Sequence, residues 1–200
     1  MVFEKIHHIT FEMKDSNFIK NYVQEFSKLL KLDKKLIASL EDIKESILEA
    51  KKLNKKVIII GNGGSAAISS HFSVDLTKNA RVRCINFNES DLLTCFSNDF
   101  GYDQAFLQAL RFYGDEGDIL ISISSSGKSK NIINACKEAK LLGFSKIITL
   151  SGMSKNNPLQ KMGNINIWVD SKAYNLIENV HQFYLLLIID LIIGKSVYSA

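Results

Sequence analysis

The first 55 residues show a helical pattern of apolar positions. Apolar side chains recur at four-residue spacing, as at Phe18, Tyr22 and Phe26, which is the spacing of one face of an α-helix. The pattern predicts a helical N-terminal segment over residues 1–54. An exposed apolar face needs a partner. The apolar face could pack against the rest of the chain or against another subunit, and we favour packing in an oligomer.

From Val57 onward the pattern changes to short apolar runs separated by segments of helix length. Runs that are apolar on both faces and alternate with helices are typical of parallel sheets with helices on both sides. The predicted fold class is therefore α/β, with residues 55–200 as the core of a single domain that spans residues 1–200. An apolar helix over 173–193 is expected to be buried nearly all round. The predicted strands are 56–60, 83–87, 118–123, 146–150 and 165–169.

Composition narrows the classes of function. The chain has 200 residues, 46% of them hydrophobic, and a net charge of +4 without a basic run, so nucleic-acid binding has no support. Cys84, Cys95 and Cys136 lack the spacing of a disulfide framework or a zinc knuckle and are expected to be packing residues in a reducing compartment. The N-terminus lacks an apolar signal segment, and the apolar stretch 183–193 is too short for a bilayer. We expect a cytoplasmic protein without a membrane partner.

Two polar loops follow predicted strands. The sequence GNGGS occupies residues 61–65 and the sequence SSSGKS occupies 124–129. Ligands of parallel sheets bind at the carboxyl ends of strands, where backbone N–H groups at the start of a helix attract anions. Each loop could be a plain turn, but together they predict a cradle for a phosphorylated metabolite. Neither has the GK[ST] or GxGxxG spacing, so no nucleotide cofactor is expected.

Two pairs of titratable residues share a helix face. His71 and Asp75 are four residues apart, and Glu178 and His181 are three apart, spacings that bring side chains together on a helix. Such pairs suit a metal site or a base with an orienting partner. Each pair alone is equally compatible with an ordinary helix contact.

Three segments together resemble the SIS (sugar isomerase) domain, and within it the phosphoheptose isomerases. They are GNGGSAA at 61–67 with His71 beyond it, SNDFGYD at 97–103, and ISSSGKS at 123–129. The resemblance implies a three-layer SIS sandwich with a five-stranded parallel sheet. It also implies a homotetramer with active sites at subunit boundaries, and often one zinc ion per site.

The resemblance also implies roles for individual residues. Serines would hold the phosphate, while Asn62 and Asp99 would contact the sugar. Ser125 stands where the family usually has Thr. The expected substrate-binding residues are Asn62, Gly63, Ser65, Asp99, Ser124, Ser125, Ser126 and Ser129.

The predicted chemical half of the site departs from the family. His71 falls on a family metal ligand, but Asp75 replaces a Glu and Glu178 replaces a Gln. Leu186 stands where the family has its second metal-binding His. Asn79 also replaces a family Arg. The phosphate half is thus intact, whereas the chemical half is rebuilt.

The rebuilt half still offers acid–base groups. Glu178 is the expected base, with His181 or His71 to polarise or protonate the sugar oxygen. A divalent metal, such as zinc, held by His71, Asp75 and Glu178 would stabilise oxyanion charge. The catalytic candidates are therefore Glu178, His71, Asp75 and His181.

Two hypotheses of function follow. The first is an aldose–ketose isomerase that converts sedoheptulose 7-phosphate to D-glycero-D-manno-heptose 7-phosphate, in the synthesis of nucleotide-activated heptose for lipopolysaccharide or capsule. The second is a non-catalytic SIS module that senses a phosphosugar or docks onto a partner protein. The position of Glu178 relative to the phosphate cradle distinguishes them.

Overall fold

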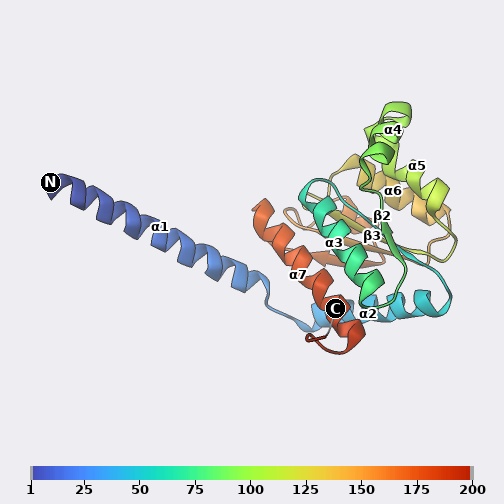
Figure 1. Cartoon of the computed structure of the whole chain (residues 1–200), viewed down its shortest axis with the longest axis horizontal. Helices are drawn as coiled ribbons and strands as arrows, with labels where there is room; N and C mark the ends of the chain where they lie inside the picture. The colour runs from blue at the N-terminus through green and yellow to red at the C-terminus, as the bar shows by residue number, and fades with distance from the viewer. Residues whose placement is uncertain (1, 199–200) are drawn as a thin grey trace. The chain divides into compact units, whose positions relative to one another are not determined.

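The computed structural model describes residues 2–198, and the side chains from residue 15 onward (Figure 1). The chain divides into two compact units, residues 1–32 and 33–200. The first unit is helix α1 (Val2–Leu29), on which Phe18, Ile19 and Val23 are exposed. Helix α2 (Lys34–Lys52) belongs to the second unit. The predicted N-terminal segment of residues 1–54 thus contains two helices that lie in different units.

The second unit is built on a five-stranded parallel sheet, as predicted, and the strand order is β2-β1-β3-β4-β5. Strands β1 and β3 are neighbours, and their register pairs Ile60 with Ser122. The two polar loops that follow these strands therefore emerge side by side at the carboxyl edge of the sheet. The strands are β1 (Val57–Ile60), β2 (Cys84–Asn86), β3 (Ile119–Ser124), β4 (Lys146–Ser151) and β5 (Ile165–Trp168).

Helices cover both faces of the sheet, which makes the predicted three layers. On one face, α3 (Gly64–Lys78) and α2 both pack against α7 (Tyr174–Ile193). On the other face, α5 (Ala105–Tyr113) packs against α6 (Lys130–Leu141). Helix α4 (Ser90–Phe100) has no buried residue and leads into the short 3-10 helix η1 (Tyr102–Gln104). A second 3-10 helix, η2, spans Leu159–Lys161.

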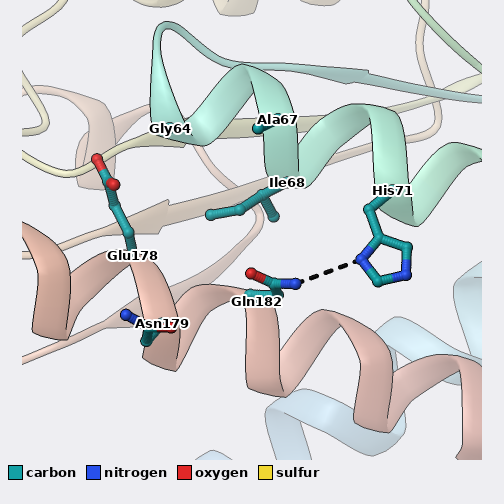
Figure 2. A pocket seen from close by; sticks show the side chains of 7 residues that line it. All are labelled: Gly64, Ala67, Ile68, His71, Glu178, Asn179 and Gln182. Carbon is teal, nitrogen blue, oxygen red and sulfur yellow. Dashed lines mark hydrogen bonds between the residues drawn. The ribbon is translucent and has the colours of Figure 1, made fainter.

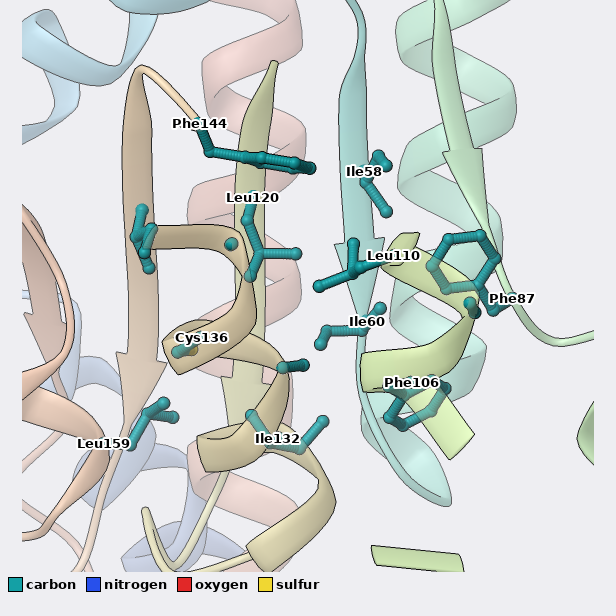
Figure 3. Close-up of a cluster of buried hydrophobic side chains, with 14 residues drawn as sticks. Ile58, Ile60, Phe87, Phe106, Leu110, Leu120, Ile132, Cys136, Phe144 and Leu159 are labelled. Atoms are coloured by element: carbon teal, nitrogen blue, oxygen red, sulfur yellow. The ribbon is translucent and has the colours of Figure 1, made fainter. Parts of the chain in front are cut away.

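A hydrophobic cluster fixes α5 and α6 on the sheet (Figure 3). Ile58 and Ile60 lie two residues apart on β1, so their side chains point to the same face. There they meet Phe106 from α5 and Ile132 from α6. Because Ile132 lies in the first turn of α6, this cluster also sets where α6 begins, directly after the serine-rich loop.

Helix α7 is less buried than its sequence predicts. By length and composition it is the one described helix that could cross a membrane, yet it packs against α2, α3 and β4 and buries Val180 and Tyr184 in the core. Phe183 and, near the end of the helix, Leu191 remain exposed. The expectation of burial nearly all round is therefore wrong, because neighbouring elements of one chain cover only one side of the helix.

The cysteines also differ in environment. Cys84 and Cys136 are buried, and burial raises the pKa of the Cys136 thiol to about 11, which keeps it protonated. Cys95 is exposed on α4. The expectation of three packing thiols is therefore wrong for Cys95, because the face of α4 that carries it is not covered within the chain.

Two phenylalanines of α5 test the cluster. Phe106 is 2% exposed and Phe112 is 68% exposed. We expect Phe106→Ala to lower the free energy of unfolding by about 3–5 kcal/mol, because it removes a buried ring and leaves a cavity. Phe112→Ala, the matched control, is expected to cost about 1 kcal/mol or less, since it loses only a ring contact with Phe96. Urea unfolding measures both, and equal losses would contradict the packing described.

Candidate functional site

A hollow of about 160 Å³ lies at the carboxyl ends of β1 and β3. We call it the serine hollow. Six of the eight predicted substrate-binding residues line it, so the structure brings the two loops together as predicted. Its lining residues are Asn62, Ser65, Ile123, Ser124, Ser125, Ser126, Ser129, Tyr174 and Glu178.

The serine-rich loop folds as a tight turn around Gly127. The Gly127 N–H donates to the Ser124 carbonyl at 2.8 Å, and the Gly127 carbonyl accepts from the Leu159 N–H at 3.0 Å. Gly127 has a φ of +65°, and a Cβ there would overlap the carboxamide of buried Asn157, so only glycine fits. The turn brings the Ser124 and Ser129 hydroxyl oxygens to 3.0 Å from each other.

Helix N-termini supply the positive potential of the serine hollow. Ser65 lies in the first turn of α3, and Ser129 is the residue before α6; both line the hollow. Free backbone N–H groups at a helix start favour an anion. None of the described residues that line the hollow is cationic, and Lys128 is exposed. The hollow therefore suits a phosphoryl group bound by neutral donors.

A cluster of polar side chains surrounds Asn62. The Asn62 and Asn131 carboxamides exchange two hydrogen bonds, at 3.0 and 2.9 Å. The Tyr102 hydroxyl donates to Asn62 Oδ1 at 2.8 Å. The cluster thus ties η1, α6 and the loop after β1 together at the edge of the serine hollow.

A second hollow, of about 390 Å³, opens between α3 and α7 (Figure 2). We call it the helix hollow. Its volume lies in the range of small-ligand sites. Glu178 lines both hollows, so a phosphate in one and a sugar in the other would both lie near its carboxylate. The lining residues are Gly64, Ala67, Ile68, His71, Glu178, Asn179 and Gln182.

The Glu178 carboxylate lies against the start of α3, as Figure 2 shows. A Cβ on Gly64 would overlap this carboxylate, and Glu178 Oε1 accepts from the Ser125 hydroxyl at 3.5 Å. The positive end of the helix dipole favours a carboxylate in this place. Glu178 is half-buried and thus remains reachable from the helix hollow.

His71 lines the helix hollow from α3, and its imidazole lies beside Gln182 (Figure 2). Its Nε2 lies 3.3 Å from Asp75 Oδ2, and its Nδ1 lies 3.3 Å from the Gln182 amide nitrogen. Both ring nitrogens therefore have partners, which fix the orientation of the imidazole. The arrangement is that of a base held by an orienting carboxylate.

The predicted metal ligands do not form one donor set. Among the described residues, no three His, Cys, Asp or Glu side chains come together to hold a metal ion. His71 pairs with Asp75 and Gln182, while Glu178 lies beside Ser125 and Gly64. As folded, these residues do not fit a zinc site, so we derive no catalytic step through a metal.

His181 lies in the core and lines neither hollow. It is 0% exposed, and its Nε2 lies 3.1 Å from the Ser151 carbonyl oxygen. Burial lowers its pKa to about 4. The prediction of His181 as a catalytic acid is therefore corrected: three residues after Glu178, its side chain points toward β4 instead of the helix hollow.

Two predicted substrate-binding residues, Asp99 and Gly63, also lie outside the hollows. Asp99 is exposed in the last turn of α4, where Asn98 donates to its carboxylate at 2.9 Å. Gly63 precedes α3 as its N-cap residue and is exposed. The structure thus does not bring Asp99 to the serine hollow within the described chain.

Sequence reasoning missed four polar residues of the site: Gln182, Asn131, Tyr102 and Asn157. Gln182 lies on α7 one turn after Glu178, at helical spacing that could have identified it. Tyr102 lies within the matched segment 97–103, and Asn131 comes two residues after the serine-rich loop ends at Ser129. Their partners are distant in sequence, so only the fold shows their contacts.

The comparisons with known proteins agree with this geometry. The SIS domain family profile matches residues 21–152, more than half of the chain. The chain belongs to the SIS domain family. Its relatives include the phosphoheptose isomerase of Campylobacter concisus, 34% identical over 84% of this chain and 90% of the relative. The phosphoheptose isomerase of Fusobacterium nucleatum is 32% identical over 87% of this chain and 92% of the relative.

Solved structures show the same likeness. The phosphoheptose isomerase from Neisseria gonorrhoeae superimposes with a TM-score of 0.81 and 25% identity, over 91% of this chain and 99% of that one. The enzyme from Francisella tularensis gives a TM-score of 0.80 and 26% identity, over 91% of this chain and 97% of that one. The predicted resemblance to phosphoheptose isomerases is confirmed.

The buried His181 makes stability depend on pH. Unfolded, the imidazole binds a proton near pH 6.5, whereas the folded chain resists protonation down to about pH 4. Between these values the unfolded state holds more protons, so stability falls as the pH falls. From pH 7.5 to 5, we expect this group to remove about 2 kcal/mol from the free energy of unfolding.

His181→Gln isolates this contribution, because its amide can still donate to the Ser151 carbonyl but does not titrate. Urea unfolding at both pH values is the measurement. The variant is expected to lose less stability than the wild type on acidification. Equal losses would show that His181 is not buried in its neutral form.

Proposed function

We propose that this protein isomerises sedoheptulose 7-phosphate to D-glycero-D-manno-heptose 7-phosphate. The observation that carries the proposal is the place of Glu178, which lines both a hollow of neutral phosphate donors and a hollow with a paired histidine. The names of the relatives support the same reaction. Because those relatives are enzymes, the hypothesis of a non-catalytic phosphosugar module loses ground.

In this proposal the phosphoryl group occupies the serine hollow. Hydroxyls of Ser65, Ser124 and Ser129 donate to its oxygens, and the positive ends of the α3 and α6 dipoles favour its charge. Binding at the phosphate end orients the sugar so that its other end enters the helix hollow. Fixing the reacting carbons beside Glu178 lowers the entropic barrier to proton transfer.

The reaction moves one proton between two neighbouring carbons. Glu178 takes the proton from C1 of the ketose, the electron pair forms the C1–C2 double bond, and the carbonyl oxygen on C2 receives a proton from His71. The enediol then loses its O1 proton to His71 while Glu178 returns a proton to C2. This sequence regenerates both groups and needs no redox cofactor.

His71 acts in this scheme through Nδ1. The Gln182 amide nitrogen can only donate to that atom, so the scheme requires that the sugar displace Gln182 and that Nδ1 carry a proton when the ketose binds, while Asp75 keeps hold of Nε2. A carboxylate behind a histidine fixes its tautomer and stabilises its protonated form. Asp75 is therefore a positioning residue, and zinc has no assigned part in the scheme.

We place this reaction in the cytoplasm, in the synthesis of activated heptose for surface polysaccharide. We also propose a homotetramer. Exposed Phe18, Ile19 and Val23 on α1 and exposed Phe183 and Leu191 on α7 support association, because apolar residues in such groups favour a protein partner. Light scattering is expected to give the mass of four 22.5 kDa chains, and a monomer would contradict the proposal.

Glu178→Gln tests the assigned base. The amide cannot accept the C1 proton, so we expect kcat to fall by about 10²- to 10⁴-fold. NMR would follow conversion of sedoheptulose 7-phosphate and the exchange of its C1 proton with D₂O. Glu89→Gln is the matched control, since it makes the same change at an exposed residue outside both hollows.

The outcomes separate the enzyme from its mechanism. A wild-type protein that converts no heptose or pentose phosphate would refute the isomerase proposal. Full activity of Glu178→Gln would refute the role of Glu178 as the base, but it would leave the isomerase proposal standing. A parallel assay with a chelator bears on zinc: loss of activity that Zn²⁺ restores would mean that a rearranged chain or a partner subunit completes a metal site.

A further inference from the structure

We infer that Asn131 is a positioning residue of the serine hollow, which holds Asn62 so that one amide N–H faces the substrate. The inference rests on the proposed function and deepens it. Asn131 does not line the serine hollow and so acts through Asn62, which does.

The orientation of the Asn131 carboxamide is set from the backbone. Asn131 is 2% exposed, and its Oδ1 accepts from the Ile132 N–H at 3.0 Å. A backbone N–H can only donate, so the oxygen of Asn131 must lie on that side. The same oxygen accepts from Asn62 Nδ2 at 3.0 Å, and Asn131 Nδ2 donates to Asn62 Oδ1 at 2.9 Å.

The orientation of Asn62 follows from that of Asn131. Its Oδ1 accepts from Asn131 and also from the Tyr102 hydroxyl at 2.8 Å, which uses both lone pairs. Its Nδ2 spends one hydrogen on Asn131, and a second hydrogen remains. Asn62 therefore offers the serine hollow a donor and no acceptor.

This polarity matches the substrate class. A phosphoryl or sugar oxygen that accepts a hydrogen bond fits the remaining N–H, whereas an unfixed carboxamide could also turn its oxygen toward the phosphate. Fixing the amide before binding reduces the ordering cost of binding. Loss of the hydrogen bonds between Asn131 and Asn62 should therefore weaken substrate binding more than it slows the chemical step.

Asn131→Asp is the test, since it keeps the shape of the side chain. The carboxylate still accepts from Ile132 and Asn62 but cannot donate to Asn62 Oδ1. An acid in the first turn of α6 is compatible with the helix dipole. We expect KM for sedoheptulose 7-phosphate to rise about tenfold, with kcat changed by less than about threefold.

Two comparisons separate positioning from a general structural role. If Asn131 acts through Asn62, then Asn131→Asp combined with Asn62→Ala should have the same KM as Asn62→Ala alone. Asn134→Asp makes the same change one turn along α6, where the amide contacts the Asp103 carbonyl, and should keep the wild-type KM. Additive effects in the double variant would overturn the inference.

Calorimetry measures the affinity for inorganic phosphate without any sugar conversion, so it tests this inference separately from the proposed function. If the wild type converts the sugar but Asn131→Asp keeps its KM, positioning by Asn131 is overturned. If the wild type converts no sugar but binds phosphate about tenfold more tightly than Asn131→Asp, and Asn131→Asp has no further effect on phosphate affinity in the Asn62→Ala background, positioning stands and the isomerase proposal falls. Should Asn131→Asp not fold, Asn131→Ser removes both carboxamide contacts with Asn62. An unchanged phosphate affinity of that variant would overturn the inference.

Discussion

The site depends on the parallel pairing of β1 with β3. This pairing ends both strands at the same edge of the sheet, with Ile60 beside Ser122, so two loops that are about 60 residues apart in sequence become neighbours. Parallel strands also need long crossover connections, and the connections after β1 and β3 begin with the helices α3 and α6. The starts of α3 and α6 consequently converge on one small volume, and the serine hollow is the space between them.

The two hollows divide the work between different kinds of side chain. The serine hollow holds hydroxyls, an amide and backbone donors, which bind an anion without a buried counter-charge. Titratable groups lie in the helix hollow, on α3 and α7. Glu178 stands where the two meet. A base in this place can reach the sugar in the helix hollow while its carboxylate also borders the serine hollow.

Much of the fold follows from the sequence, because its signals are local. The five strands are short apolar runs, and the loops after β1 and β3 are visible as glycine and serine clusters. The direction of each residue on α7 is less accessible: Glu178 faces the hollows, whereas His181 faces β4 and is fully buried. The three-residue spacing of Glu178 and His181 predicts that they lie near each other on α7. It does not predict how the helix is rotated about its axis, and that rotation decides which of them faces the hollows.

Contacts between distant residues were beyond the sequence. Tyr102 and Asn62 are 40 residues apart, and Asn131 and Asn62 are 69 apart. Each of these residues alone reads as an ordinary loop or helix-start residue. The exposed position of Asp99 likewise follows from α4, which has no buried residue. The packing of whole elements thus decided which polar residues reach the site.

The close approach of Gly64 and Glu178 couples the substitutions that the chain can accept at two positions far apart in sequence. A side chain at position 64 would need the space that the end of the Glu178 side chain now fills, so Gly64 can be exchanged only if that carboxylate moves or residue 178 is smaller. Libraries that randomise α3 alone would therefore displace the Glu178 carboxylate whenever they change Gly64. Varying positions 64 and 178 together would reach pairs with a side chain at 64 and a smaller residue at 178.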